Sequence, residues 1–183
     1  IAISCLDERP EVGAIAFDIV SPDRPGRRPR TLPESVSMFI GCGHVLRLAT
    51  AAQVGFYAPT PGQYGSEEQA LCLRLADRGN FVLELPGVHV WHDKAWQGRD
   101  WYPLHRSGVC NDLSLALRRC PNPQVFWVLP GKLCSYLIYW LRNPARISAG
   151  LAGVRLFLKH FVTGLKKREP VKPATYRRFR SHS

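Results

Sequence analysis

The sequence of 183 residues predicts a protein of the α/β class. Two patterns lead to this prediction: short runs rich in Val, Ile and other strand formers, and longer segments whose apolar residues recur at helical spacing. A third pattern is confined to the end of the chain, where apolar residues at helical spacing are accompanied by Lys and Arg. We therefore expect a sheet with flanking helices over residues 1–122, followed by a helical, basic, amphipathic tail over residues 123–183.

Composition and charge narrow the class of protein. With 45% hydrophobic and 21% charged residues, the chain has the composition of a folded globular protein. Residues 142–183 contain eleven Lys or Arg and one Glu, so this segment carries ten of the eleven net positive charges. A uniformly basic surface for nucleic acid is therefore disfavoured. A basic tail that meets anionic lipid, or another acidic surface, is favoured instead.

The cysteines and the first residues indicate the cellular setting. Six cysteines are scattered without a C-x-x-C pair or zinc-type spacing: Cys5, Cys42, Cys72, Cys110, Cys120 and Cys134. We expect reduced, buried thiols in a cytosolic protein. No signal-peptide pattern is visible. Because the chain opens at Ile1 with no lead-in, we expect it to be a piece of a longer protein.

The first half of the chain alternates predicted strands and helices. Residues 11–20, "EVGAIAFDIV", predict a strand, which a loop rich in Pro, Gly and Arg follows. Residues 36–48 form an apolar, strand-like run interrupted by Gly41 and Gly43, where the backbone can approach a ligand or turn tightly. Residues 49–55 predict a short helix.

A longer helix is predicted from Ser66 to Gly79. Ser66 as N-cap and Gln69 three residues later form a capping-box pattern, and Gly79 tolerates the left-handed conformation that ends many helices. Glu67 and Glu68 then occupy the first turn, where the helix dipole favours carboxylates. Their acidity is explained either by capping alone or by a chemical role.

After this helix the predicted strands and helices are shorter and less regular. Two strand-like runs flank the turn dipeptide Pro86-Gly87, residues 96–106 predict a loop, and residues 111–119 predict a helix. His92 stands at the end of the second run, where functional side chains often collect. The alternative for His92 is an ordinary packed side chain.

The last third is apolar and basic. Residues 125–141 are apolar but interrupted by Pro130-Gly131-Lys132, and they are too short to be assigned as a bilayer-spanning helix. Residues 147–167 predict an amphipathic helix that lies in a membrane interface or packs on the domain with a solvated basic face. Its predicted apolar face comprises Leu151, Val154, Leu158, Phe161 and Leu165, with Arg155, Lys159 and Lys166 on another face.

Common enzyme motifs are missing from the sequence. It contains no G-x-G-x-x-G after a strand, no P-loop and no H-E-x-x-H, so dinucleotide, nucleoside-triphosphate and zinc-hydrolase functions lack support. The spacing of Ser, Cys and His singles out no nucleophile and base. The remaining candidates for chemistry are the acidic pair, the glycines at 41 and 43, and His92.

Taken in order, these segments resemble the later half of a family 2 glycosyltransferase with the GT-A fold. The resemblance covers residues 8–112 and rests on "ERPEVGAIAFDIV", "FIGCGHVLRLATAAQVGFY", "GSEEQALCLRLADRGNFVLELPGVHVWHD" and a stretch ending "HRSGVCND". In that family a Gly-rich strand end precedes a helix ending in Gly-Gly-Phe. An acidic pair then opens the next helix, and the following strand ends in His. The family's pair is commonly Glu-Asp, whereas this chain has Glu67-Glu68, and its next acidic position is Ala70 here.

The resemblance implies a mixed GT-A-like sheet and an inverting glycosyltransferase. Such an enzyme transfers a sugar from a nucleotide-diphosphate donor to a hydroxyl of a lipid-linked or polysaccharide acceptor, as in cell-envelope or exopolysaccharide synthesis. Glu68 matches the general base, and Glu67 matches an orienting or acceptor-binding residue beside it. A helix N-terminus keeps such a carboxylate ionised, which suits a base at neutral pH.

The resemblance also implies residues for the donor and for a metal ion. Mg²⁺ or Mn²⁺ would take up charge on the leaving diphosphate, and His92 matches the metal ligand. The expected substrate-binding residues are Gly41, Cys42 and Gly43 near the donor sugar, and Arg99 and Arg106 near the phosphates.

The family's donor half carries an Asp-x-Asp metal motif and precedes the matched region. This sequence contains no Asp-x-Asp. We therefore expect an acceptor-side portion that is inactive alone and peripheral on the cytoplasmic face of the cell membrane. The alternative is a non-catalytic peripheral membrane binding module. Nucleic-acid binding ranks last, and no nucleic-acid partner is expected.

Overall fold

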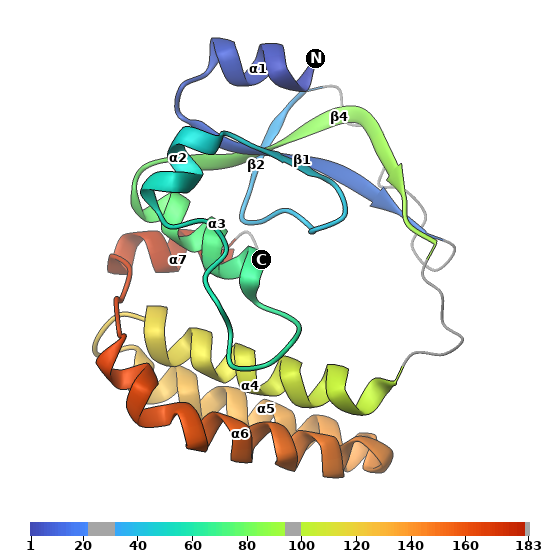
Figure 1. Ribbon diagram of the computed structural model, residues 1–183, viewed down its shortest axis with the longest axis vertical. Coiled ribbons are helices and arrows are strands. Elements are labelled where there is room, and N and C mark those ends of the chain that lie inside the picture. Colours follow the sequence, from blue (N-terminus) through green and yellow to red (C-terminus); the bar gives the residue numbers. More distant parts are fainter. Residues whose placement is uncertain (22–31, 94–99, 182–183) are drawn as a thin grey trace. The chain divides into compact units, whose positions relative to one another are not determined.

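The computed structural model describes residues 1–21, 32–93 and 100–181 (Figure 1). These residues form a four-stranded mixed sheet, seven α-helices and one short 3-10 helix, which confirms the α/β class. The chain divides into two compact units. Unit 1 comprises Ile1–Ala58, Glu68–Gly98 and Arg177–Ser183, and unit 2 comprises Pro59–Glu67 and Arg99–Tyr176. This division differs from the expected ranges 1–122 and 123–183, because the helix before residue 122 packs with the helices after it.

The sheet of unit 1 has the strand order β2-β4-β1-β3. Its strands are β1 (Val12–Val20), β2 (Glu34–Val36), β3 (His44–Leu46) and β4 (Phe81–Trp91). The central pair β1 and β4 is parallel, whereas β3 and β2 are antiparallel to their neighbours. With α1 (Ala2–Glu8), the central strands form a buried cluster of Leu6, Val12, Ile15, Leu83 and Leu85.

The predicted turn at Pro86-Gly87 is wrong, because β4 runs through it as one strand. The register pairs Ala16 with Glu84 and then Asp18 with His89. Between these pairs β1 advances by two residues and β4 by five, so β4 accommodates the extra residues as a bulge. Gly87 has φ 73° and supplies the left-handed backbone that the bulge requires.

Two helices of unit 1 match their predictions. The short helix is α2 (Leu48–Gln53), and the longer one is α3 (Glu67–Asp77). Gly79 has φ 88°, and the N–H of Asn80 donates to the Leu75 carbonyl at 3.0 Å, which closes the helix as expected. Of the predicted run 36–48, only Val36 and His44–Leu46 lie in strands, in β2 and β3, and Leu48 begins α2.

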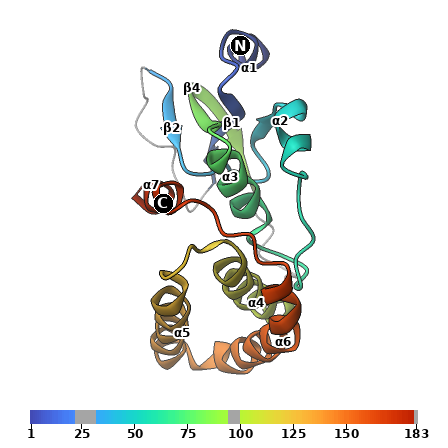
Figure 2. The same ribbon diagram turned by 90° about the vertical axis from the view of Figure 1, so that its left-hand side faces the viewer.

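Unit 2 is built on three long helices, α4 (Trp101–Arg119), α5 (Val125–Arg142) and α6 (Ile147–Lys166), which lie side by side in Figures 1 and 2. The 3-10 helix η1 (Pro144–Arg146) joins α5 to α6, and α7 (Pro173–Ser181) is the last described helix. A buried cluster between the long helices comprises Val109, Cys110, Leu113, Leu117, Trp140 and Phe157.

One predicted boundary in this region is wrong, and the interruption expected at Pro130 does not end a helix. Helix α4 begins at Trp101 rather than at 111, because the Asp100 side chain accepts a hydrogen bond from the Tyr102 N–H at 2.9 Å and caps the helix. Helix α5 continues through Pro130 instead of being interrupted there. In the described ranges, no helix has both the length and the apolarity needed to cross a bilayer.

Candidate functional site

The Glu68 carboxylate lies directly against Gly41. A Cβ added at Gly41 would come within 2.3 Å of Glu68 Oε1, so any side chain at 41 would occupy the position of this oxygen. Glu68 is half-buried in the first turn of α3. The structure therefore brings together the predicted base and the first glycine of the predicted donor-sugar floor, 27 positions apart in the sequence.

Gly43 places the same loop over the carboxyl ends of β1 and β4. Its added Cβ would meet Ile19 Cδ1 at 2.3 Å and Val90 Cγ2 at 3.4 Å, and its carbonyl accepts the Phe17 N–H at 3.0 Å. His92 follows the end of β4, where its N–H donates to the Val20 carbonyl at 2.8 Å. In open α/β sheets, ligands bind beyond the carboxyl ends of parallel strands.

The entry to α3 differs from the expected cap. Ser66 has φ 71°, in the left-handed region, whereas an N-cap residue usually has an extended backbone. Positive φ is uncommon at a residue other than glycine and often marks a functional site. The expected capping geometry is therefore not the one that the Ser66 backbone adopts. Next to it, Glu67 Oε2 is buried and has no hydrogen-bond partner among the described residues.

The helix face behind Glu68 is apolar. The pKa of the Cys72 thiol is raised to about 12, chiefly by burial; a hydrogen bond with the Phe39 backbone lowers this pKa, and the nearby charge of Glu68 raises it. Cys72 is therefore a neutral thiol at physiological pH and does not compete with Glu68 as a base. The expectation of buried thiols holds for Cys72, Cys110 and Cys120, but Cys42 and Cys134 are exposed.

His44 is a residue of this region that the sequence interpretation missed. Its ring stacks on Phe39 at 4.2 Å between centroids, and its Nε2 lies 2.9 Å from the Tyr57 hydroxyl. Its Nδ1 is buried without a hydrogen-bond partner among the described residues. The signal that could have identified His44 is its place directly after Gly43.

The predicted metal ligand His92 is half-exposed at the strand end. In the described ranges, no three His, Cys, Asp or Glu side chains gather closely enough to hold a metal ion. The described residues therefore do not form a complete site for Mg²⁺ or Mn²⁺ by themselves. The role of His92 stays a prediction that requires further ligands.

The roles of the two predicted phosphate-binding arginines stay predictions. Arg106 is exposed on α4 in unit 2, and Arg99 lies outside the described residues. Cys42, between the two glycines, is an exposed free thiol. The structure thus brings together Glu68, Gly41 and Gly43 in unit 1, with His92 at the end of the strand pair that Gly43 covers.

Comparisons of the chain with models of protein families, with curated proteins and with solved structures gave no match.

Proposed function

We propose that the chain is the acceptor-side portion of an inverting glycosyltransferase of the GT-A type. The observation that carries the proposal is the close approach of Glu68 to Gly41, in the same loop as Gly43, which contacts Ile19 and Val90 near the carboxyl ends of β1 and β4. The resemblance to family 2 glycosyltransferases predicts a base and a Gly-rich floor in this order along the chain. The contact between Glu68 Oε1 and Gly41 supports the proposal.

In the proposed reaction, Glu68 accepts the proton of the acceptor hydroxyl while the oxygen of that hydroxyl attacks the anomeric carbon of the donor sugar. The bond from this carbon to the nucleoside diphosphate breaks, and the configuration at the carbon inverts. A positioned base of this kind contributes about 10²–10⁴-fold to the rate. Gly41 and Gly43 have no Cβ, so the sugar and the Glu68 carboxylate can approach the same stretch of backbone. No step is assigned to a metal ion.

The test is sugar transfer by the protein expressed with and without its natural upstream coding sequence. A panel of nucleotide-diphosphate sugars is supplied as donors, and release of nucleoside diphosphate is measured. We expect release only when an upstream segment with Asp-x-Asp is present. Robust transfer by the isolated chain would show that the donor half is not required, and no transfer by either form would contradict the proposed function.

Exposed apolar surface on unit 2 favours a second candidate, peripheral binding to a membrane. Helix α6 exposes a stripe of apolar side chains, and α5 exposes another: Ile147, Leu151, Leu158, Val162 and Leu165 on α6, and Phe126, Trp127, Leu137, Ile138 and Leu141 on α5. Val154 and Phe161, expected in the same stripe, instead pack against the core. Basic residues beside such a stripe favour an anionic membrane surface.

Vesicle flotation tests this candidate. We expect vesicles with anionic lipids to retain the protein, and the double variant Leu158→Glu, Val162→Glu to lose this binding. Leu48→Glu is the matched control, because Leu48 is equally exposed but lies in α2 of unit 1. Equal loss with the control, or no retention of the wild type, would contradict membrane binding through α6.

A further inference from the structure

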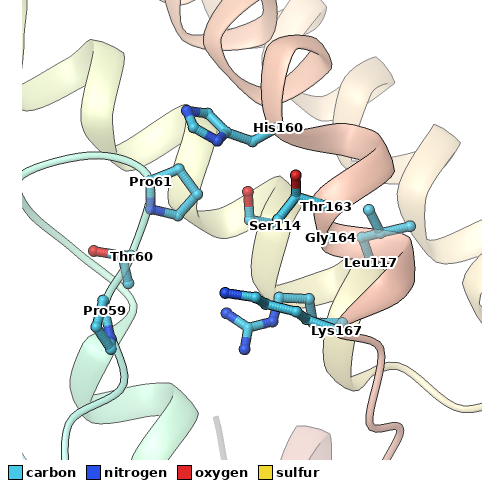
Figure 3. A pocket seen from close by; sticks show the side chains of 10 residues that line it. Pro59, Thr60, Pro61, Ser114, Leu117, His160, Thr163, Gly164 and Lys167 are labelled. Carbon is cyan, nitrogen blue, oxygen red and sulfur yellow. The ribbon is translucent and has the colours of Figure 1, made fainter.

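Unit 2 contains a small pocket between the loop of Pro59–Pro61 and the helices α4 and α6 (Figure 3). Its volume is about 170 Å³. The pocket is lined by Pro59, Thr60, Pro61, Ser114, Leu117, Arg118, His160, Thr163, Gly164 and Lys167. These residues include two cations, a histidine and three hydroxyl groups, but no carboxylate.

Arg118 is the residue of this pocket whose hydrogen bonding is incomplete. Its Nε is buried and has no hydrogen-bond partner among the described residues. Burial lowers the pKa of Arg118, and the neighbouring charge of Arg119 lowers it further, while Glu169 acts in the opposite direction. A guanidinium stays charged even so. A buried donor without a partner is costly, which indicates that an acceptor outside the described residues completes it.

The other basic groups surround the same space. Figure 3 shows His160 and Thr163 from α6, and Lys167 directly after the end of α6, on the side facing the loop of Pro61. Two further arginines near the pocket already have acceptors. Arg119 Nη1 donates to Glu169 Oε2 at 2.9 Å, and Arg168 donates to the carbonyls of Leu117 and Cys120. The positive charge available to a ligand is therefore that of Arg118 and Lys167, with His160 beside them.

We propose that this pocket binds the phosphate or diphosphate group of a soluble ligand. Guanidinium and ammonium groups with hydroxyl donors form the chemistry that recognises phosphate oxygens. The pocket holds several waters, since each occupies roughly 30 Å³ in the liquid, but it is smaller than the ~300–1,000 Å³ typical of sites that enclose a drug-sized ligand. It therefore suits the anionic group of a ligand and leaves the rest of that ligand outside.

The orientation of α6 favours a soluble phosphate over a lipid headgroup. At about 100° per residue, His160 lies on the side of α6 roughly opposite to the exposed stripe that contains Leu158 and Val162. A lipid reached through this stripe would carry its phosphate on the stripe's side of the helix. The proposal is independent of sugar transfer, because its residues belong to unit 2 and not to the site of Glu68.

The experiment is a titration of the whole chain with inorganic phosphate and with pyrophosphate, followed by calorimetry and by chemical shifts of His160. We expect binding with a Kd of about 1 mM or tighter for pyrophosphate. The variant Lys167→Gln should weaken it by about tenfold, and Arg118→Gln by at least as much. Lys159→Gln, the same change on α6 outside the pocket, should leave the Kd unchanged.

Three results would overturn the proposal. One is absence of binding by the wild type. Another is equal weakening by Lys159→Gln, which would indicate attraction by net charge alone. The third is binding of the protein to vesicles that contain phosphatidic acid, if pyrophosphate does not displace the vesicles and Lys167→Gln abolishes the binding. This result would assign the pocket to a lipid. Because Arg118 is partly buried, circular dichroism checks that its variant folds, and Lys167→Gln decides the outcome if it does not.

Discussion

At the scale of single residues, the absence of a side chain at Gly41 determines where the Glu68 carboxylate can lie. The Gly41 backbone and Glu68 Oε1 are so close that a methyl group at 41 would overlap the oxygen. The atom that such a methyl would displace is the end of a flexible side chain, so the fold tolerates the change better than the site does. A substitution at Gly41 should therefore change the position of the Glu68 carboxylate more than it changes the stability of unit 1.

The variant Gly41→Ala is expected to retain stability and lose activity. Its free energy of unfolding should change by about 0.5 kcal/mol or less, the usual range for substitutions without a buried clash. The rate of sugar transfer in the protein with its upstream segment should fall about 100-fold, because a displacement of about 1 Å at a catalytic group costs this much. Unchanged turnover would show that the position of Glu68 does not matter. Large destabilisation would show that Gly41 is structural.

The titration of His105, in unit 2, is expected to make the stability of the protein depend on pH. Its Nε2 accepts the Trp140 Nε1 hydrogen at 3.0 Å, so this nitrogen carries no proton in the folded state. Burial, and then the charge of Arg146, lowers the pKa of His105 below its ordinary value of 6.5. Below pH 6.5 the unfolded chain therefore binds more protons than the folded chain, and stability falls as the pH falls.

Urea unfolding from pH about 7.5 to about 5 measures this effect. The wild type should lose stability across the range, and His105→Gln should lose less, because glutamine does not titrate. Equal loss in both proteins would assign the pH dependence to other groups.

At the scale of elements, small residues allow α4 and α6 to pack closely. A Cβ at Gly153 would lie 2.6 Å from the Arg106 carbonyl oxygen and 2.9 Å from Val109 Cβ. Backbone atoms cannot move aside as a side-chain end can. Gly164 also packs closely further along α6, but there a Cβ would meet a side-chain end, Leu117 Cδ2, at 2.9 Å.

Gly153→Ala is therefore expected to destabilise the protein by about 1–3 kcal/mol, the range for overpacking of a close interface. Gly108→Ala is the matched control, because a Cβ at Gly108 meets nothing within 4 Å and alanine favours a helix over glycine by about 1 kcal/mol. Thermal unfolding of both variants measures the difference. A Gly153→Ala protein as stable as the control would contradict this account of the helix contact.

The elements with a strong local pattern could be predicted from the sequence. Val12–Val20 was predicted from its β-branched residues, and the end of α3 from Gly79. Helix α4 was predicted too short because Pro103 and the aromatic residues near its start resemble a loop, and the cap by Asp100 decides otherwise. The Pro86-Gly87 bulge could not be predicted, because its partner is β1, far away in the sequence.

The candidate site could be predicted only in part, because some of its contacts join residues that are far apart in the sequence. The roles of Glu68 and of the two glycines came from their order along the chain, and the contact between Glu68 and Gly41 is known only from the fold. His44 was missed because its contacts with Phe39 and Tyr57 depend on the path of a loop without regular pattern. The phosphate pocket was missed because its residues come from three separate segments.

At the scale of the whole molecule, the two units carry different candidate functions. Unit 1 contains Glu68 and the strand ends that suit acceptor chemistry, whereas unit 2 contains exposed apolar helices and a cationic pocket. A glycosyltransferase that acts on a lipid-linked acceptor would use the site of Glu68 and the exposed apolar surfaces of unit 2. A non-catalytic membrane module requires only those of unit 2, so the two accounts differ in whether Glu68 matters.

The most direct test of the proposed function is the rate of sugar transfer by Glu68→Gln in the protein with its upstream segment. Glutamine keeps the shape of the side chain but cannot accept the proton of the acceptor hydroxyl, so kcat should fall by about 10²–10⁴-fold while folding and donor binding are retained. Glu11→Gln, an exposed glutamate just before β1, is the control and should leave kcat unchanged. Equal turnover by Glu68→Gln and Glu11→Gln would contradict the assignment of Glu68 as the base.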